Sequence, residues 1–102
     1  MSIYEGPASK IVSGNFVVTT AGTQQRLTAT STPCVWVKIT AAPANTAGIV
    51  VGDADIDATA DAETGITIAK GTTETFHISD ANLLWVDAPN SGDEFGYLIG
   101  KV

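Results

Sequence analysis

Apolar residues recur at every second position along most of this chain, and β-branched side chains occupy many of those positions. A period of two is typical of β-strands, because successive side chains of a strand point to opposite faces. Turn-forming residues such as Gly, Pro and Asn separate the periodic segments. The pattern predicts eight short strands, over the ranges Ile11–Thr20, Gln25–Thr30, Pro33–Thr40, Gly48–Asp53, Gly65–Lys70, Thr72–Ser79, Leu83–Ala88 and Phe95–Lys101.

Short strands at this spacing, with no credible helix between them, are typical of an antiparallel β-sandwich or a jelly-roll-like barrel. The 102 residues fit one domain. The first residues differ from the rest, because Gly6 and Pro7 interrupt a segment whose apolar residues stand apart from the periodic strands. We therefore predict an extended N-terminal arm over residues 1–12 and a single all-β sandwich domain over residues 13–102.

Alternation divides the third predicted strand into two faces. The face that carries Lys38 should be the wetter one, and this places Trp36 on the outside of the sheet. Trp85 lies between Leu84 and Val86 and is predicted to lie in the core instead. The predicted inner face consists of Val35, Val37 and Ile39, and the predicted outer face of Cys34, Trp36, Lys38 and Thr40.

The charge balance narrows the classes of partner. The net charge is −6, from 11 acidic and 5 basic residues, and the basic residues are scattered singly along the chain. Nucleic acids and anionic membrane surfaces both require clustered Lys and Arg, so neither is expected as a partner. Charged residues make up only 16% of the chain, below the typical ~25%, as suits a surface that partners cover. The first ten residues lack the pattern of a signal peptide and no apolar run is long enough to span a membrane, so we expect the chain in the cytoplasm where it is made.

The acidic segment Ala54–Thr64 is predicted to be a loop, and it is the one candidate for a metal site. Carboxylates at alternate positions suit Ca²⁺. With Asp53 as the first position of an EF-hand loop, however, Ala58 stands where the glycine is required and Thr64 where the bidentate glutamate is required. We therefore predict a solvated loop and no tightly bound metal. The carboxylates concerned are Asp53, Asp55, Asp57, Asp61 and Glu63.

Candidate catalytic residues are few. His77 is the one histidine, so any Ser–His or Cys–His pair would have to include it, and it sits within a predicted strand. Cys34 is the one cysteine, is predicted to be a small apolar strand residue, and cannot form an internal disulfide. Phosphate-binding glycine loops and zinc-ligand spacings are absent from the sequence. We expect no enzymatic activity and no cofactor.

Contact with a partner is the role that fits the remaining side chains. Trp is enriched at protein interfaces, which favours a contact role for the outward Trp36. A sugar-stacking role remains the alternative, because flat rings pack on sugar faces. The predicted N-terminal arm offers further apolar side chains. The predicted partner-contact residues are Ile3, Tyr4, Ile11, Val12 and Trp36.

The order of motifs from about residue 16 to residue 99 resembles small β-sandwich virion proteins of tailed double-stranded DNA bacteriophages. The shared features are a strand ending in Val51-Gly52 before an Asp-rich turn, the G-I-x-I-x-x-G segment at 65–71, and the D-x-x-x-L-W-V-D-A segment at 80–88. Proteins of this group serve as capsid decoration (cement) proteins, head-fibre bases or tail components, and of these roles the resemblance leads us to expect a decoration protein that stabilises the capsid. The resemblance also implies a homotrimer on the major capsid protein lattice of the virion, assembled in the host bacterial cytoplasm. A carbohydrate-binding or tail-associated receptor-binding module is the alternative function.

Overall fold

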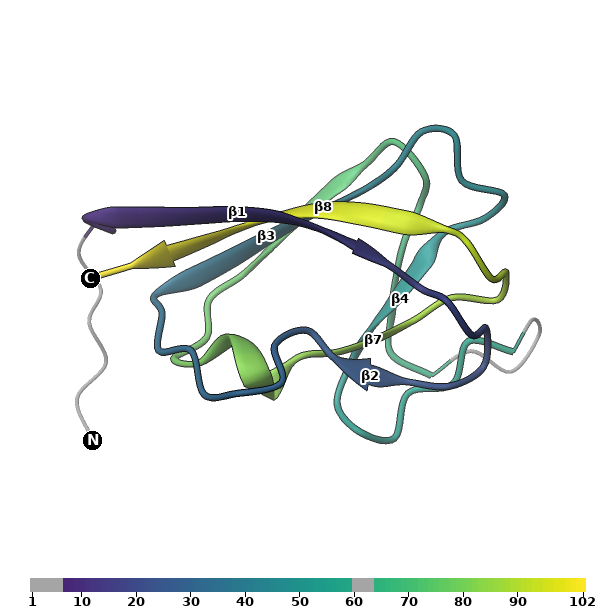
Figure 1. Cartoon of the computed structure of the whole chain (residues 1–102), viewed down its shortest axis with the longest axis horizontal. Helices are drawn as coiled ribbons and strands as arrows, with labels where there is room; N and C mark the ends of the chain where they lie inside the picture. Colours follow the sequence, from purple (N-terminus) through teal and green to yellow (C-terminus); the bar gives the residue numbers. More distant parts are fainter. Residues whose placement is uncertain (1–6, 60–63) are drawn as a thin grey trace.

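Eight β-strands and one short 3-10 helix make up the part of the chain that the computed structural model describes, residues 7–59 and 64–102 (Figure 1). No helix in this part of the chain is long and apolar enough to cross a membrane. The elements in order are β1 (Lys10–Val17), β2 (Gln25–Arg26), β3 (Trp36–Ala41), β4 (Ile49–Gly52), β5 (Ile66–Ile68), β6 (Thr73–Phe76), the helix η1 (Ala81–Leu83), β7 (Trp85–Asp87) and β8 (Glu94–Lys101).

The strands form two antiparallel sheets of four strands each, in the orders β1-β8-β3-β6 and β2-β7-β4-β5. In Figure 1 the long strands β1, β8 and β3 cross the upper half of the molecule, and β2 and β7 lie below them. The all-β antiparallel sandwich predicted from the period of two is confirmed.

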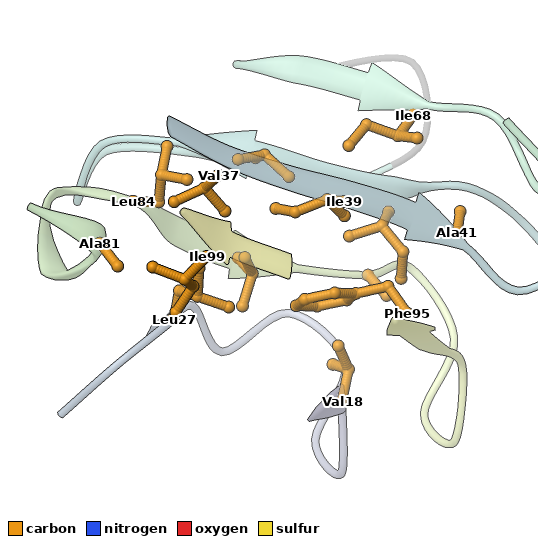
Figure 2. Packing of buried hydrophobic residues seen from close by; sticks show 14 of the residues in the cluster. Val18, Leu27, Val37, Ile39, Ala41, Ile68, Ala81, Leu84, Phe95 and Ile99 are labelled. Atoms are coloured by element: carbon orange, nitrogen blue, oxygen red, sulfur yellow. The ribbon is translucent and has the colours of Figure 1, made fainter. Parts of the chain in front are cut away.

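The hydrophobic core lies between the two sheets (Figure 2). Val37 and Ile39 of β3 are fully buried, and Phe95 of β8 is buried and stacked on Phe16 of β1, with ring centroids 5.1 Å apart. Each such side chain contributes about 1.5–3 kcal/mol by leaving water. The predicted inner positions of the third strand are thus correct at Val37 and Ile39.

Buried polar side chains hold the loop between β3 and β4 against the start of β8. The two carboxylate oxygens of Asp93 accept hydrogen bonds from the backbone N–H groups of Thr46 (2.8 Å) and Ala47 (3.0 Å). The Asn45 amide donates to the Glu94 carbonyl (2.8 Å) and accepts from the Glu94 N–H (2.9 Å). These bonds satisfy backbone groups that the loop could not pair within a sheet.

All of the predicted strands except the last are shorter in the structure than expected. The segment 25–30 forms a strand only at Gln25–Arg26. The predicted strand 83–88 contains the end of η1 and only the three residues of β7. Asp80 caps η1, and its side chain accepts the Asn82 N–H. This local cap competes with extended backbone at Leu83.

The face assignment is wrong at the start of the third predicted strand. β3 begins at Trp36, and Pro33 takes part only in an isolated bridge. Strict alternation therefore does not extend back to Val35 and Cys34. Cys34, predicted to face outward, is buried in the core, whereas Val35, predicted to face inward, is half-buried.

The predicted boundary between arm and domain is also wrong. Residues Lys10–Val12 belong to β1, where Ile11 pairs with Gly100 and Val12 pairs with Ile99. The backbone N–H of Ser9 also bonds to β8, at the Lys101 carbonyl (2.7 Å). The sandwich thus includes residues assigned to the arm, because the pairing of β1 with β8 continues through them. Residues 1–6 of the predicted arm lie outside the described residues.

Candidate functional site

The outer face of the β1-β8-β3-β6 sheet carries the candidate contact surface. The strand register aligns Ile11, Gly100 and Trp36 in one row across β1, β8 and β3. Leu98 and Lys38 are paired in the next row. Paired residues project to the same face of a sheet. These positions alternate with the buried positions of their strands, so their side chains point away from the second sheet.

Trp36 lies across Gly100. A Cβ atom at position 100 would be only 2.3 Å from Cε2 of the indole and 2.7 Å from Cδ2, so a glycine is needed there for the ring to keep its place. The Lys38 ammonium lies over the same ring, with Nζ 5.7 Å from the ring centroid. This is within the range of a cation–π contact. The predicted outward orientation of Trp36 is confirmed.

Ile11, Trp36 and Leu98 together form what we call the apolar patch. Ile11 is 63% exposed and Leu98 is 37% exposed, and the half-buried Trp36 lies between β8 and Lys38. Apolar side chains that adjoin one another on a solvated sheet face are typical of contact sites for other macromolecules. Leu98 was absent from the predicted contact residues, although alternation placed it on the same face as Gly100.

The structure brings together two of the predicted contact residues. Ile11 and Trp36 lie on either side of Gly100 on the outer face. Val12 points to the inner face of β1. Ile3 and Tyr4 lie outside the described residues. A contact role for these side chains stays a prediction.

Trp85 is not part of the main core, contrary to the prediction. It lies on the outer face of the second sheet and packs against a separate small cluster of Val50, Ile56 and Ala58. The Arg26 guanidinium lies over its ring, 5.1 Å from the centroid. Trp85 therefore is a half-buried structural residue, which leaves Trp36 as the tryptophan of the candidate surface.

The acidic segment uses its carboxylates to hold its own backbone. An Asp53 oxygen accepts the Asp55 N–H (2.9 Å), and an Asp57 oxygen accepts the Thr59 N–H (2.8 Å). The hydrogen bonds from Thr59 lower the pKa of Asp57. Within residues 7–59 and 64–102, no three His, Cys, Asp or Glu side chains are grouped as metal ligands. Asp61 and Glu63 lie outside the described residues, and the expected lack of a tightly bound metal stays a prediction.

The two side chains considered for nucleophilic chemistry differ in environment. Cys34 is buried, and its thiol donates to the Ile78 carbonyl (3.3 Å). Burial, and after it the charge of Asp80, raises the pKa of the thiol, while Lys101 lowers it. A raised pKa disfavours the thiolate, which is the nucleophilic form. His77 is exposed just after the end of β6.

Asp80 joins the turn before β3 to the helix η1. Its carboxylate accepts hydrogen bonds from the Ser31 hydroxyl, the Thr32 N–H (2.7 Å) and the Asn82 N–H (3.0 Å). Desolvation alone would raise the pKa of Asp80, but these three hydrogen bonds and the charge of Arg26 together lower it. Asp80 thus has a structural role that accounts for its perturbed pKa.

The sequence matches no family model, and it has no significant match among curated proteins or among solved structures.

Proposed function

We propose that this chain is a non-enzymatic structural protein of a tailed bacteriophage virion, a decoration protein that binds the outer lattice of the major capsid protein. The observation that supports the proposal is the apolar patch, with Trp36 held across Gly100 on the outer face of a four-stranded sheet. Buried aromatic anchors supply much of the energy of protein interfaces. A protein that binds only the assembled lattice stabilises it by mass action.

The low charge of the chain also supports this proposal. Lys38 is the charged residue in the two rows that hold the apolar patch, and its ammonium is already engaged with Trp36. A partner that covers the apolar patch therefore has one charge to pair or avoid, and the long Lys38 side chain can keep its ammonium in water at the rim of the contact. Residues 1–8, which precede the first residue bonded to β8, are proposed as the anchoring arm in place of residues 1–12. The homotrimer that the resemblance implies stays a prediction, and a two-fold dimer through β1 would exclude it as the form of the free chain in solution.

Co-sedimentation with undecorated, expanded heads of the phage that carries the gene tests the proposal. Ile11→Ser should weaken binding because Ile11 belongs to the apolar patch. Ile66→Ser is the matched control, since Ile66 is similarly exposed (55% against 63%) but lies in β5 of the other sheet. Equal binding by both variants, or labelling of tails only, would contradict the proposal.

A carbohydrate-binding module is the second candidate function. The observation that favours it is the position of the Trp36 indole across Gly100, since a ring laid on a sheet can stack on the apolar face of a sugar. A titration of tryptophan fluorescence with sugars, compared between the natural chain and Trp36→Ala, distinguishes the candidates. A saturable change that Trp36→Ala abolishes would favour the sugar-binding function over the decoration function.

A further inference from the structure

The strand β1 is the longest edge strand of the sandwich. The other edge strands are β6, β2 and β5, with four, two and three residues, against eight in β1. β6 also carries Glu74, which pairs with the buried Ile39 and so projects to the inner side of its sheet. Short strands and inward charges are devices that prevent edge-to-edge pairing. β1 lacks the first device and carries an inward charge only at its first residue, Lys10, whereas residues 11–17 contain no charge and no proline.

The backbone of β1 directs alternate residues toward its open edge. Just after the strand, the Val18 N–H donates to the Asp93 carbonyl of the adjoining segment (2.9 Å), in the same register as the β1–β8 pairs. In an antiparallel ladder, every second residue of a strand hydrogen-bonds to the neighbouring strand on one side. The backbone N–H and C=O groups of the residues between them point to the opposite side. The N–H and C=O groups that point away from β8 are those of Ile11, Ser13, Asn15 and Val17.

We propose that β1 of one copy pairs antiparallel with β1 of a second copy, about a two-fold axis at Gly14. Ile11 then lies opposite Val17 of the second copy, and Ser13 lies opposite Asn15 of the second copy. All residues in these pairs direct their backbone N–H and C=O groups to the open edge, so the two members of each pair can exchange backbone hydrogen bonds. The inference goes beyond the proposed function and does not depend on it.

The side chains select this register. On the outer face the exposed Ile11 meets Val17, which is 41% exposed, and the two polar side chains meet each other. On the inner face Val12, 44% exposed, meets the half-buried Phe16. A shift by two residues would keep the hydrogen bonds but place Ile11 opposite Asn15 or Thr19. Cross-strand apolar pairs are favourable, whereas apolar–polar pairs lose that contact.

Gly14 suits the position on the two-fold axis. Two residues that face each other there form a non-hydrogen-bonded pair, the closer of the two pair types, with Cα atoms about 4.5 Å apart. The space that a side chain of residue 14 would fill is taken by the Tyr97 ring, whose Cζ lies 2.4 Å from the ideal Cβ position. Glycine at this position lets the aromatic ring cover β1, and it leaves no side chain of its own at the axis.

The mass of the purified chain in solution tests the pairing. We expect light scattering to give twice the 10.5 kDa chain mass, falling to one chain in Ser13→Pro. Proline removes an N–H that points to the open edge, where strands tolerate it, so the circular dichroism spectrum should keep its β-sheet form. Thr75→Pro is the matched control, because the Thr75 N–H points to the open edge of β6, at the other side of the same sheet. The Thr75→Pro chain should stay dimeric.

Paired charges test the register. Ile11→Lys with Val17→Lys puts like charges opposite each other twice, and Ile11→Glu with Val17→Glu does the same. Each double variant should be monomeric alone, and an equimolar mixture should form the heterodimer. A native chain that is monomeric or trimeric, or a dimeric Ser13→Pro, would overturn the pairing. A mixture of the double variants that stays monomeric would overturn the Gly14 register.

Discussion

Replacement of Gly100 by alanine probes how Trp36 is held on the outer face. The added Cβ would lie 2.3 Å from Cε2 and 2.6 Å from Cζ2 of the indole, whereas ordinary contact begins at 3.4 Å. The ring must therefore move by about 1 Å or the β8 backbone must shift. Overpacking of this kind costs about 1–3 kcal/mol, and alanine recovers about 0.5–1 kcal/mol of the strand entropy that glycine loses. We expect a net loss of about 1 kcal/mol in the free energy of unfolding.

A double-mutant cycle separates the collision from other effects of the substitution. In a Trp36→Ala background no ring opposes the new methyl group, so Gly100→Ala should be neutral or stabilising. The coupling energy between the two positions should then be about 1–3 kcal/mol. Urea unfolding followed by far-ultraviolet circular dichroism gives a comparable signal for all four chains, whereas tryptophan fluorescence would differ because two of them keep only the Trp85 indole. Effects that add to within about 0.5 kcal/mol would refute the placement of the ring across Gly100.

Three further changes test other parts of the fold. Phe95→Ala should cost about 3–5 kcal/mol in urea unfolding, as expected of a fully buried aromatic side chain, and Trp36→Ala should cost less because Trp36 is only half-buried. Asp93→Ala leaves two loop N–H groups without their acceptor and should lower the melting temperature, at about 1–3 kcal/mol per group. The folded-state pKa of Asp80 is lowered, so its carboxylate contributes stability above the unfolded-state value of about 4 and loses it as the pH falls further. The stability difference between the natural chain and Asp80→Asn should therefore shrink on acidification in pH-dependent unfolding, and a constant difference would contradict the role of the charge.

Periodicity predicted the fold class because regular strands obey it. Within β3, Val37 and Ile39 are buried and Trp36 faces outward, as a period of two requires. The same rule failed at Cys34, where the chain has not yet entered the strand. Alternation gives faces only where the backbone is extended, and the sequence carries a weak signal of where that begins. Pro33, shortly before β3, was the residue in the sequence that could have indicated this strand boundary.

Trp85 shows a second limit of the pattern. The run from Leu83 to Val86 is apolar throughout, which favoured a core position for the tryptophan. Val86 does point into the main core, but Trp85 points to the other face and packs on a second small cluster. An unbroken apolar run indicates a strand covered on both faces, and the covering residues here come from the segment after β4. The run alone did not identify them, because that contact depends on the path of a loop.

The pairing proposed for β1 would also change the candidate contact surface. Ile11 belongs both to the apolar patch and to the open edge, and in a dimer it would lie beside Val17 of the second copy. The β1-β8-β3-β6 sheets of the two copies would then form one continuous sheet of eight strands. Its outer face would carry two apolar patches related by the two-fold axis. A partner with matching two-fold symmetry would bind both patches at once, and the second contact would benefit from a high effective concentration. Ser13→Pro should therefore weaken binding to capsid heads even though Ser13 lies outside the apolar patch. Undiminished binding by a monomeric Ser13→Pro chain would show that one patch is sufficient.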